Sequence, residues 1–249
     1  MRIKIIILAA GKGTRAFPLT RNTPKSLLDI GDGMTLLERQ LENIKKSKAI
    51  DEVVLVVGHL AEQIEAKIKM YRDNGLEVRT IYNPFYEVSN NLMSLWLAKP
   101  LMEEDFIITN GDNIFEHDVF HNLAKKHKDG IFLTISRKEA YADGDMKVLL
   151  SDGLVSRVSK EIDNDKADCE SVGLVLVSGK KYREVFKDNL EELARNKEYL
   201  SKFWLETFNL MSHKGIAIRT FEIDGKTKWK EVDFHLDLED ARKLLKLDK

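Results

Sequence analysis

The sequence has a single cysteine, Cys169, among its 249 residues. One thiol cannot form a disulfide framework or a cysteine-based zinc site, and this scarcity is typical of proteins in a reducing compartment. The simplest interpretation of Cys169 is a buried structural thiol. The sequence also lacks an excess of basic residues, since its formal net charge is −1. It therefore gives no indication that nucleic acid is a main partner.

Long hydrophobic runs are also missing. The apolar run at the N-terminus, Ile3–Ala10, covers only eight residues. A helix that crosses a bilayer needs roughly 20 apolar residues, and this run also lacks the cleavage pattern of a signal peptide. We therefore expect a soluble, cytoplasmic protein with no membrane span.

Short apolar runs alternate with helical patterns through the first half of the chain. Ile3–Leu8, Val53–Val57 and Phe106–Thr109 each have the continuous apolar character of a strand buried on both faces. Between the first two, residues 37–44 repeat leucine and isoleucine at helical spacing. This alternation predicts an α/β fold with a Rossmann-like, mostly parallel central sheet and helices on both faces.

The pattern changes after residue 136. The segment Lys147–Lys160 carries Ser151-Asp152-Gly153 between two apolar runs, which predicts a hairpin. We therefore divide the chain into an α/β core of residues 1–136 and a smaller α+β region of residues 137–249 that completes the same domain. Further elements expected in this region are a strand at 172–177 and helices at 180–196 and 199–213. The apolar face of the last helix, around Trp204, is a candidate contact for a partner subunit in a homodimer.

The stretch LAAGKGTRAFPLTRNTPK, from Leu8 to Lys25, follows the first expected strand. Residues Gly11–Ala16 fit a loose dinucleotide-binding fingerprint, which requires an uninterrupted helix after its glycines. Pro18 and Pro24 fall where that helix would run, and each removes a backbone N–H donor. The prolines therefore argue against a dehydrogenase.

A plain glycine turn would explain the glycines of this stretch but not the presence of Arg15 and Lys25. A proline-stiffened loop at the carboxyl end of a central strand can expose several N–H groups to one anion. Arg15 adds a planar fork for phosphate oxygens, and Lys25 adds a compact charge. The loop is therefore a candidate triphosphate site.

The same stretch resembles the signature L-A-A-G-x-G-T-R-x-x-P-L-T-x-x-x-P-K of the nucleotidyltransferases, which include sugar-phosphate pyrophosphorylases and cytidylyltransferases. The resemblance covers Leu8 to Lys25 almost without a gap. It implies transfer of a nucleotidyl group to a phosphorylated acceptor, with Arg15 and Lys25 as catalytic residues. The nucleotide-binding residues that it implies here are Leu8, Ala9, Ala10, Gly11, Gly13, Thr14, Arg15 and Lys25.

The resemblance also implies a magnesium site. The family places an aspartate after a strand in the middle of the sheet, and Asn110-Gly111-Asp112-Asn113 fits this position, with Gly111 and Asp112 next to the nucleotide. Near the C-terminus, WKEVDFHLDLEDARKLL resembles the cytidylyltransferase ending W-x-E-I-D-x-x-x-D-L-E-x-A. Its matching residues are Glu231 and Asp233, and we expect Asp233 to be the second ligand. Mg²⁺ keeps several waters, so two carboxylates suffice.

The segment Asn83–Ala98 resembles phosphocholine-type cytidylyltransferases in its S-N-N-x-x-S-L pattern. This implies that Asn90 or Asn91 contacts the base or ribose through its side-chain amide. Ser89 or Asn90 can alternatively cap the helix that follows. The two resemblances together favour CTP as the nucleotide.

Charged residues of the second half are candidates for acceptor binding. They are Asp145, Lys147, Lys160 and Glu170. Lys147, at the start of an expected strand, is a candidate for the acceptor phosphate. Asp143 could join the acidic residues and an aromatic ring, that of Tyr141 or Trp204, in holding a cationic amine, or they could bind hydroxyl groups. The alternative for each of them is an exposed loop charge.

The expected acceptors are small phosphorylated or phosphonylated alcohols and amines, such as phosphocholine, inositol phosphate and 2-aminoethylphosphonate. The nearest alternative is a sugar 1-phosphate uridylyl- or thymidylyltransferase. A catalytically inactive nucleotide sensor usually loses the arginine, lysine or aspartate, and Arg15, Lys25 and Asp112 are all present.

Overall fold

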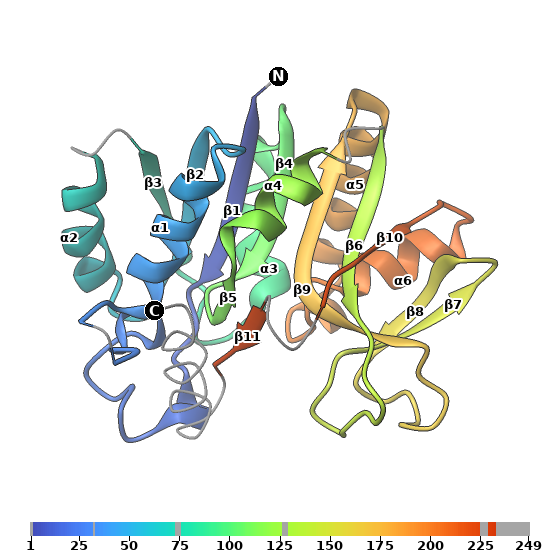
Figure 1. Cartoon of the computed structure of the whole chain (residues 1–249), viewed down its shortest axis with the longest axis horizontal. Helices are drawn as coiled ribbons and strands as arrows, with labels where there is room; N and C mark the ends of the chain where they lie inside the picture. The colour runs from blue at the N-terminus through green and yellow to red at the C-terminus, as the bar shows by residue number, and fades with distance from the viewer. Residues whose placement is uncertain (1, 32, 73–75, 126–128, 225–228, 233–249) are drawn as a thin grey trace.

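Helices cover both faces of a central β-sheet (Figure 1). The computed structural model describes residues 2–31, 33–72, 76–125, 129–224 and 229–232. The strands are β1 (Ile3–Ala9), β2 (Glu52–Val57), β3 (Glu77–Tyr82), β4 (Asp105–Asn110), β5 (Asn113–Phe115), β6 (Gly130–Ser136), β7 (Lys147–Ser151), β8 (Leu154–Ser159), β9 (Cys169–Ser178), β10 (Arg219–Glu222) and β11 (Trp229–Glu231). The α-helices are α1 (Leu36–Ser47), α2 (Ala61–Arg72), α3 (Asn91–Leu97), α4 (His117–Lys125), α5 (Lys180–Ala194) and α6 (Glu206–His213).

The central sheet has the strand order β10-β6-β9-β4-β1-β2-β3. Strands β4, β1, β2 and β3 are parallel, whereas β9 runs antiparallel to both of its neighbours, β4 and β6. The hairpin β7–β8 extends the sheet from β9. The predicted mostly parallel α/β fold is thus confirmed. A strand from the second half of the chain, β9, lies inside the central sheet.

Side chains of β1 alternate between two hydrophobic clusters, one on each face of the sheet. Ile5 and Ile7 pack with residues of α1, α2 and α4. Ile6 and Leu8 pack with residues of α3, α5 and α6 on the opposite face. In Figure 1, α1 and α4 lie in front of the sheet and α5 lies behind it. A strand buried on both faces needs a continuous apolar run, which Ile5–Leu8 provides.

No helix begins at the glycine-rich loop. The chain forms short 3₁₀ turns at Thr14–Ala16 and Lys25–Leu27, and α1 starts only at Leu36. A capping box explains that start: Thr35 Oγ1 accepts from the N–H of Glu38, whose Oε2 accepts from the N–H of Thr35 at 2.8 Å. The argument from the prolines against a dinucleotide-binding helix is therefore correct.

The helix expected at 199–213 is shorter in the structure, where α6 begins at Glu206. Residues 200–204 are tied to the start of α3 instead. The N–H of Asn90 donates to Leu200 O at 2.7 Å, and the N–H of Trp204 donates to Asn91 Oδ1 at 2.9 Å. Trp204 itself does not face a partner subunit, because its side chain is fully buried within the chain, and the homodimer stays a prediction. Cys169 is buried as expected, and burial raises the pKa of its thiol to about 11.

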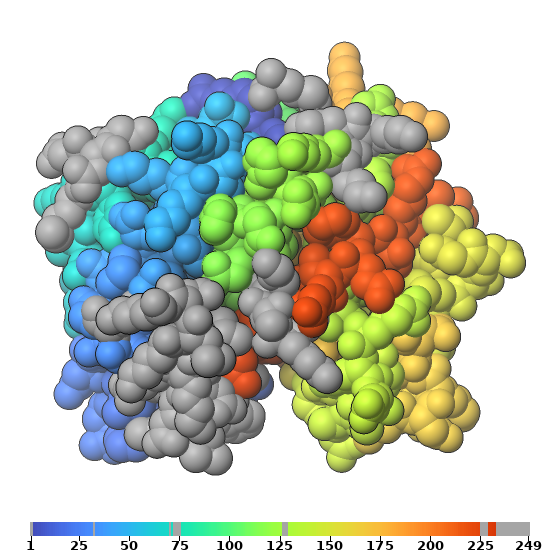
Figure 2. All heavy atoms as spheres, viewed as in Figure 1, coloured from blue at the N-terminus to red at the C-terminus, as the bar shows by residue number. Residues whose placement is uncertain are grey.

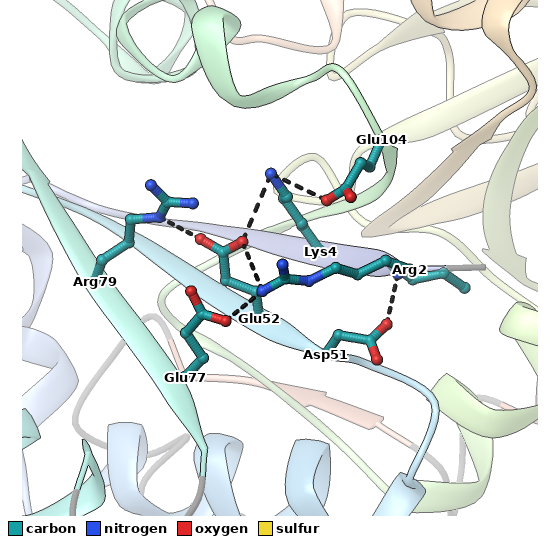
Figure 3. Close-up of polar contacts among 8 residues, drawn as sticks. Arg2, Lys4, Asp51, Glu52, Glu77, Arg79 and Glu104 are labelled. Atoms are coloured by element: carbon teal, nitrogen blue, oxygen red, sulfur yellow. Dashed lines mark hydrogen bonds and ion pairs between the residues drawn. The ribbon is translucent and has the colours of Figure 1, made fainter.

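An ion-pair network closes the amino-terminal edge of the parallel strands (Figure 3). At its centre, the buried carboxylate of Glu52 pairs with Arg79, with Lys4 at 3.5 Å and with Arg2 at 3.6 Å. Burial alone would raise the pKa of Glu52, but the hydrogen bond from Arg79 and the charges of Lys4 and Arg2 lower it below its usual range. The network therefore stabilises the sheet at the edge opposite the carboxyl ends of these strands.

None of the helices in the described ranges combines the length and the apolar composition that a bilayer crossing requires.

Candidate active site

A cleft opens at the carboxyl ends of β1 and β4. This is where ligands bind in open α/β sheets, because loops diverge from neighbouring strands at this edge. Most of the residues expected from the sequence line it: Leu8, Ala9, Ala10, Gly11, Gly13, Arg15, Lys25, Asn90, Asn91, Gly111, Asp112 and Lys160. Thr14, Asp145, Lys147 and Glu170 do not line it, and Asp233 lies outside the described residues.

Gly13 shapes the loop that follows β1. Its φ of 64° lies in the left-handed region, and its carbonyl accepts a hydrogen bond from Thr20 Oγ1 at 2.8 Å. A Cβ atom at this position would lie 3.1 Å from Lys25 Cβ. The glycine therefore allows the loop to fold closely over Lys25.

Gly111 brings the ends of β1 and β4 together. Its N–H donates to Leu8 O at 2.8 Å, and a Cβ on Gly111 would lie only 2.8 Å from Ala9 Cβ. This close approach places Asp112 beside Lys25, with 2.9 Å between Asp112 Oδ2 and Lys25 Nζ. Lys25 and Asp112, from two loops far apart in the sequence, thus meet in the cleft.

The second oxygen of Asp112 fits a cation ligand. Oδ1 is buried, and no hydrogen-bond partner for it lies among the residues that the structure describes. A buried carboxylate oxygen without a partner is costly unless a cation or donor completes it. Glu231 lines the same cleft, on a strand that pairs with β5.

In the described part of the chain, no three His, Cys, Asp or Glu side chains form a metal-binding cluster. Magnesium does not require one, since one or two carboxylates and substrate phosphates can hold it. The donor set therefore fits magnesium bound together with a nucleotide.

One tryptophan links the segment expected at the nucleotide base to the aspartate turn. Asn90 caps α3 by accepting from the N–H of Asn91 at 2.7 Å, and its Nδ2 donates to Ser201 O at 3.1 Å. Asn91 accepts from the backbone of Trp204, whose Nε1 donates to Asn110 Oδ1 at 3.0 Å. Both amides expected at the base therefore also hold residues 200–204 in place.

Lys160 lies over an aromatic ring in the cleft. Its ammonium lies 5.7 Å from the centroid of the Phe203 ring, and both residues line the cleft. The sequence did not single out Phe203, because its place in an expected helix was explained by core packing. Ser26 and Tyr86 also line the cleft and were missed. The only sequence signal for them is that they lie close to Lys25 and Asn90 along the chain.

The other acceptor candidates make contacts within the protein. Lys147 is almost fully buried, and its Nζ donates to Ala142 O at 3.2 Å and to Asn164 Oδ1 at 2.8 Å. Asp145 and Glu170 pair with the ammonium of Lys138 at 2.6 and 2.8 Å. These contacts join the loops that flank the β7–β8 hairpin.

Fold and site together define an α/β protein whose glycine-rich loop and aspartate turn meet at one cleft. Residues 4–140 match the model of the nucleotidyl transferase family, which is more than half of the chain. The protein belongs to this family.

Several relatives are cytidylyltransferases by name. The chain is 38% identical over 120 residues to the choline-phosphate cytidylyltransferase of Streptococcus pneumoniae, covering 48% of this chain and 49% of that protein. It is 33% identical over 153 residues to the enzyme of the same name from Haemophilus influenzae, covering 61% and 60%. The matches thus span about half to three fifths of these relatives. A CMP-5'-(3-aminopropyl)phosphonate synthase of Streptomyces rubellomurinus is 27% identical over 237 residues, covering 93% of this chain and 37% of that protein.

Solved structures share the fold along almost the whole chain. The CTP:phosphocholine cytidylyltransferase of Streptococcus pneumoniae superposes with a TM-score of 0.78 at 24% identity, covering 98% of this chain and all of that one. The inositol-1-phosphate CTP transferase of T. maritima also gives a TM-score of 0.78, at 21% identity, covering 98% and 94%. At these identities the similarity is one of fold.

Proposed function

We propose that the protein is a magnesium-dependent cytidylyltransferase, which transfers CMP from CTP to a small phosphorylated or phosphonylated alcohol or amine and releases pyrophosphate. The observation that carries this proposal is the Lys25–Asp112 pair, at 2.9 Å, beside a glycine-rich loop and with a buried, unsatisfied carboxylate oxygen. The cytoplasmic location expected from the sequence is part of this proposal.

In the proposed reaction, a phosphate or phosphonate oxygen of the acceptor attacks the α-phosphorus of CTP. The bond to the β-phosphate oxygen breaks, and pyrophosphate leaves with that electron pair. The nucleophile is already an anion, so no strong general base is needed. The main task of the protein is to bring two anions together in line.

The residues of the cleft divide this task. Arg15 and the N–H groups around Gly11 and Gly13 would hold the β- and γ-phosphates. Lys25 would neutralise charge on the α-phosphate and the incoming phosphate. Asp112 and Asp233 would hold magnesium, which when bound neutralises phosphate charge that develops during the transfer.

The Lys25–Asp112 contact implies an exchange of partners on substrate binding. In the structure, the ammonium of Lys25 compensates the carboxylate of Asp112. Where Asp112 would hold a divalent cation, the ammonium of Lys25 would turn to phosphate oxygens. Cation and nucleotide should therefore bind cooperatively.

The preference for CTP rests on resemblance and on the names of the relatives. The experiment that tests it measures pyrophosphate release from each of the four ribonucleoside triphosphates and dTTP with phosphocholine, inositol phosphate, 2-aminoethylphosphonate or glucose 1-phosphate. We expect turnover with CTP and one of the first three acceptors. Turnover only with a sugar 1-phosphate and UTP or dTTP would establish the alternative activity, and tight NAD binding without turnover would contradict both.

A further inference from the structure

The ammonium of Lys138 lies in a cage of two carboxylates and an aromatic ring. Its Nζ lies 2.6 Å from Asp145 Oδ2, 2.8 Å from Glu170 Oε2 and 5.7 Å from the centroid of the Tyr141 ring. The Glu170 side chain is only 8% exposed. Lys138, Tyr141 and Asp145 lie in the loop 137–146, and Glu170 lies near the start of β9. The loops 137–146 and 160–168 form a lobe at the lower right of the molecule in Figure 2.

The walls of this cage are held in place by other contacts. Asp145 Oδ2 also accepts from the N–H of Ala142 at 2.6 Å, and the hydroxyl of Tyr141 donates to Asp168 O at 3.3 Å. Lys147 ties the same loop to Asn164 on the neighbouring one. The cage is therefore a fixed feature of the lobe, and its geometry does not depend on Lys138 alone.

Two carboxylates with an aromatic face are the groups that recognise organic ammonium ions. Here the ammonium belongs to the chain itself. Burial raises the pKa of Glu170, whereas the pKa of Lys138 is raised by its two carboxylate partners in spite of burial. Lys138 therefore stays charged and compensates a buried carboxylate that would otherwise be costly.

The cage borders the acceptor half of the cleft. Gly144 and Met146, the chain neighbours of Asp145, line the cleft, and so does Ser171, the neighbour of Glu170. Lys160, the cation expected to meet the acceptor, lines the same part. A cationic group on the acceptor would thus reach the cage, which the ammonium of Lys138 already occupies.

We propose that Lys138 determines acceptor specificity: it fills the cage of Asp145, Glu170 and Tyr141, and so excludes acceptors that need an organic ammonium to bind there. The acceptors that remain carry neutral hydroxyl groups at this end, as inositol phosphate does. The role of Lys138 in acceptor choice rests on the proposed function, whereas its position in the cage is independent of that function.

Choline is the probe for the cage, and it requires no turnover. The measurement is the thermal unfolding midpoint of wild type and Lys138→Ala in choline chloride, with sodium chloride at the same concentration as the salt control. A ligand that binds only the folded state raises its unfolding temperature. We expect choline to raise the midpoint of Lys138→Ala and to leave wild type unchanged, with binding by the variant tighter by about tenfold or more in calorimetry.

Three further variants sharpen the test. Lys166→Ala removes another lysine of the same lobe, one that pairs with Asp163 at 2.6 Å, and should behave as wild type. Lys138→Arg keeps a cation in the cage and should not bind choline. Lys138→Ala combined with Glu170→Gln should lose the binding gained by the single variant.

Equal binding of choline to wild type and Lys138→Ala, or no binding to a folded Lys138→Ala, overturns the proposal. Lys138→Met serves if the alanine variant does not fold. In the acceptor assay, Lys138→Ala should shift the ratio of kcat/KM toward phosphocholine and away from inositol phosphate. If no acceptor supports turnover in any variant, the proposed function fails, while the choline measurement still decides whether Lys138 fills the cage.

Discussion

The indole Nε1 of Trp204 donates a hydrogen bond to the side-chain oxygen of Asn110, 3.0 Å away. These residues are far apart in the sequence, and Asn110 ends the strand that leads directly to Asp112. The same tryptophan donates its backbone N–H to Asn91. A single fully buried side chain therefore sets the position of the aspartate turn relative to the segment expected at the nucleotide base.

Replacing Trp204 by phenylalanine should loosen this connection while keeping an aromatic ring in the core. The half-buried Asn110 Oδ1 then loses its donor, and a typical hydrogen bond contributes about 0.5–1.5 kcal/mol to the unfolding free energy. Because the turn carrying Asp112 is then less well positioned, we expect kcat/KM to fall by about tenfold or more. Urea unfolding and pyrophosphate release measure the two effects.

Trp96→Phe is the matched control for Trp204→Phe. Trp96 Nε1 donates to Glu191 Oε2 at 2.7 Å, and Trp96 does not line the cleft. This variant should lose stability with little change in kcat/KM. An equal loss of kcat/KM in both variants would mean that the effect of Trp204 is one of general stability.

Lys25→Ala and Asp112→Asn should each lower turnover by about 10²–10³-fold, because each removes a preorganised charge from the transferring phosphate or its cation. The pair is largely shielded from solvent, with 13% of the Lys25 and 20% of the Asp112 side chain exposed, so each variant should also lose about 1–3 kcal/mol of unfolding free energy. Lys67→Ala breaks a comparable ion pair with Glu38, at 2.8 Å and away from the cleft, and should leave turnover unchanged. Activity close to that of wild type in either cleft variant would refute the assignment.

The exchange of partners at Asp112 can be tested in the absence of nucleotide. Lys25→Met removes the ammonium that pairs with this carboxylate, and among the described residues the buried Oδ1 has no hydrogen-bond partner. We expect Mn²⁺, followed by electron paramagnetic resonance, to bind this variant about tenfold more tightly than wild type, which corresponds to about 1.4 kcal/mol of lost competition. Lys12→Met removes a nearby lysine that pairs with Glu87 and should bind Mn²⁺ as wild type does. Unchanged affinity in Lys25→Met would show that no exchange takes place.

The network around Glu52 should make stability depend on pH. The folded-state pKa of Glu52 is lowered, so its contribution is complete above the unfolded pKa of about 4.3 and is lost as pH falls through the lower folded value. Glu52→Gln should therefore be clearly less stable than wild type at pH 7, with the difference shrinking below about pH 4. Urea unfolding across this pH range measures it, with Glu62→Gln, at an exposed position of α2, as the control. A difference that is constant with pH would contradict the account.

Much of the fold could be predicted from the sequence because its signals are local. Ile5–Leu8 is apolar at every position, as a doubly buried strand requires, and it forms the centre of β1. The meeting of Lys25 and Asp112 also follows from local signals, since each lies in a loop after a parallel strand and the carboxyl ends of such strands share one edge.

The features that were missed depend on contacts between distant segments. The helix expected at 199–213 starts late because Asn90 and Asn91 bind residues 200–204, and nothing in the spacing of those residues shows this. Lys147 appears from its position to be a free cation at a strand start, but Asn164 on another loop binds its ammonium. The sequence shows that a loop carries a charged residue, but it does not show which distant residue that side chain contacts.

The position of β9 has a consequence for folding during synthesis. Until residues 169–178 leave the ribosome, β4 and β6 each lack the neighbour that separates them in the finished sheet. The first 136 residues therefore emerge with open strand edges that can pair with other chains. A gene truncated between β6 and β9 should yield an insoluble product even though every residue of the glycine-rich loop and the aspartate turn is present.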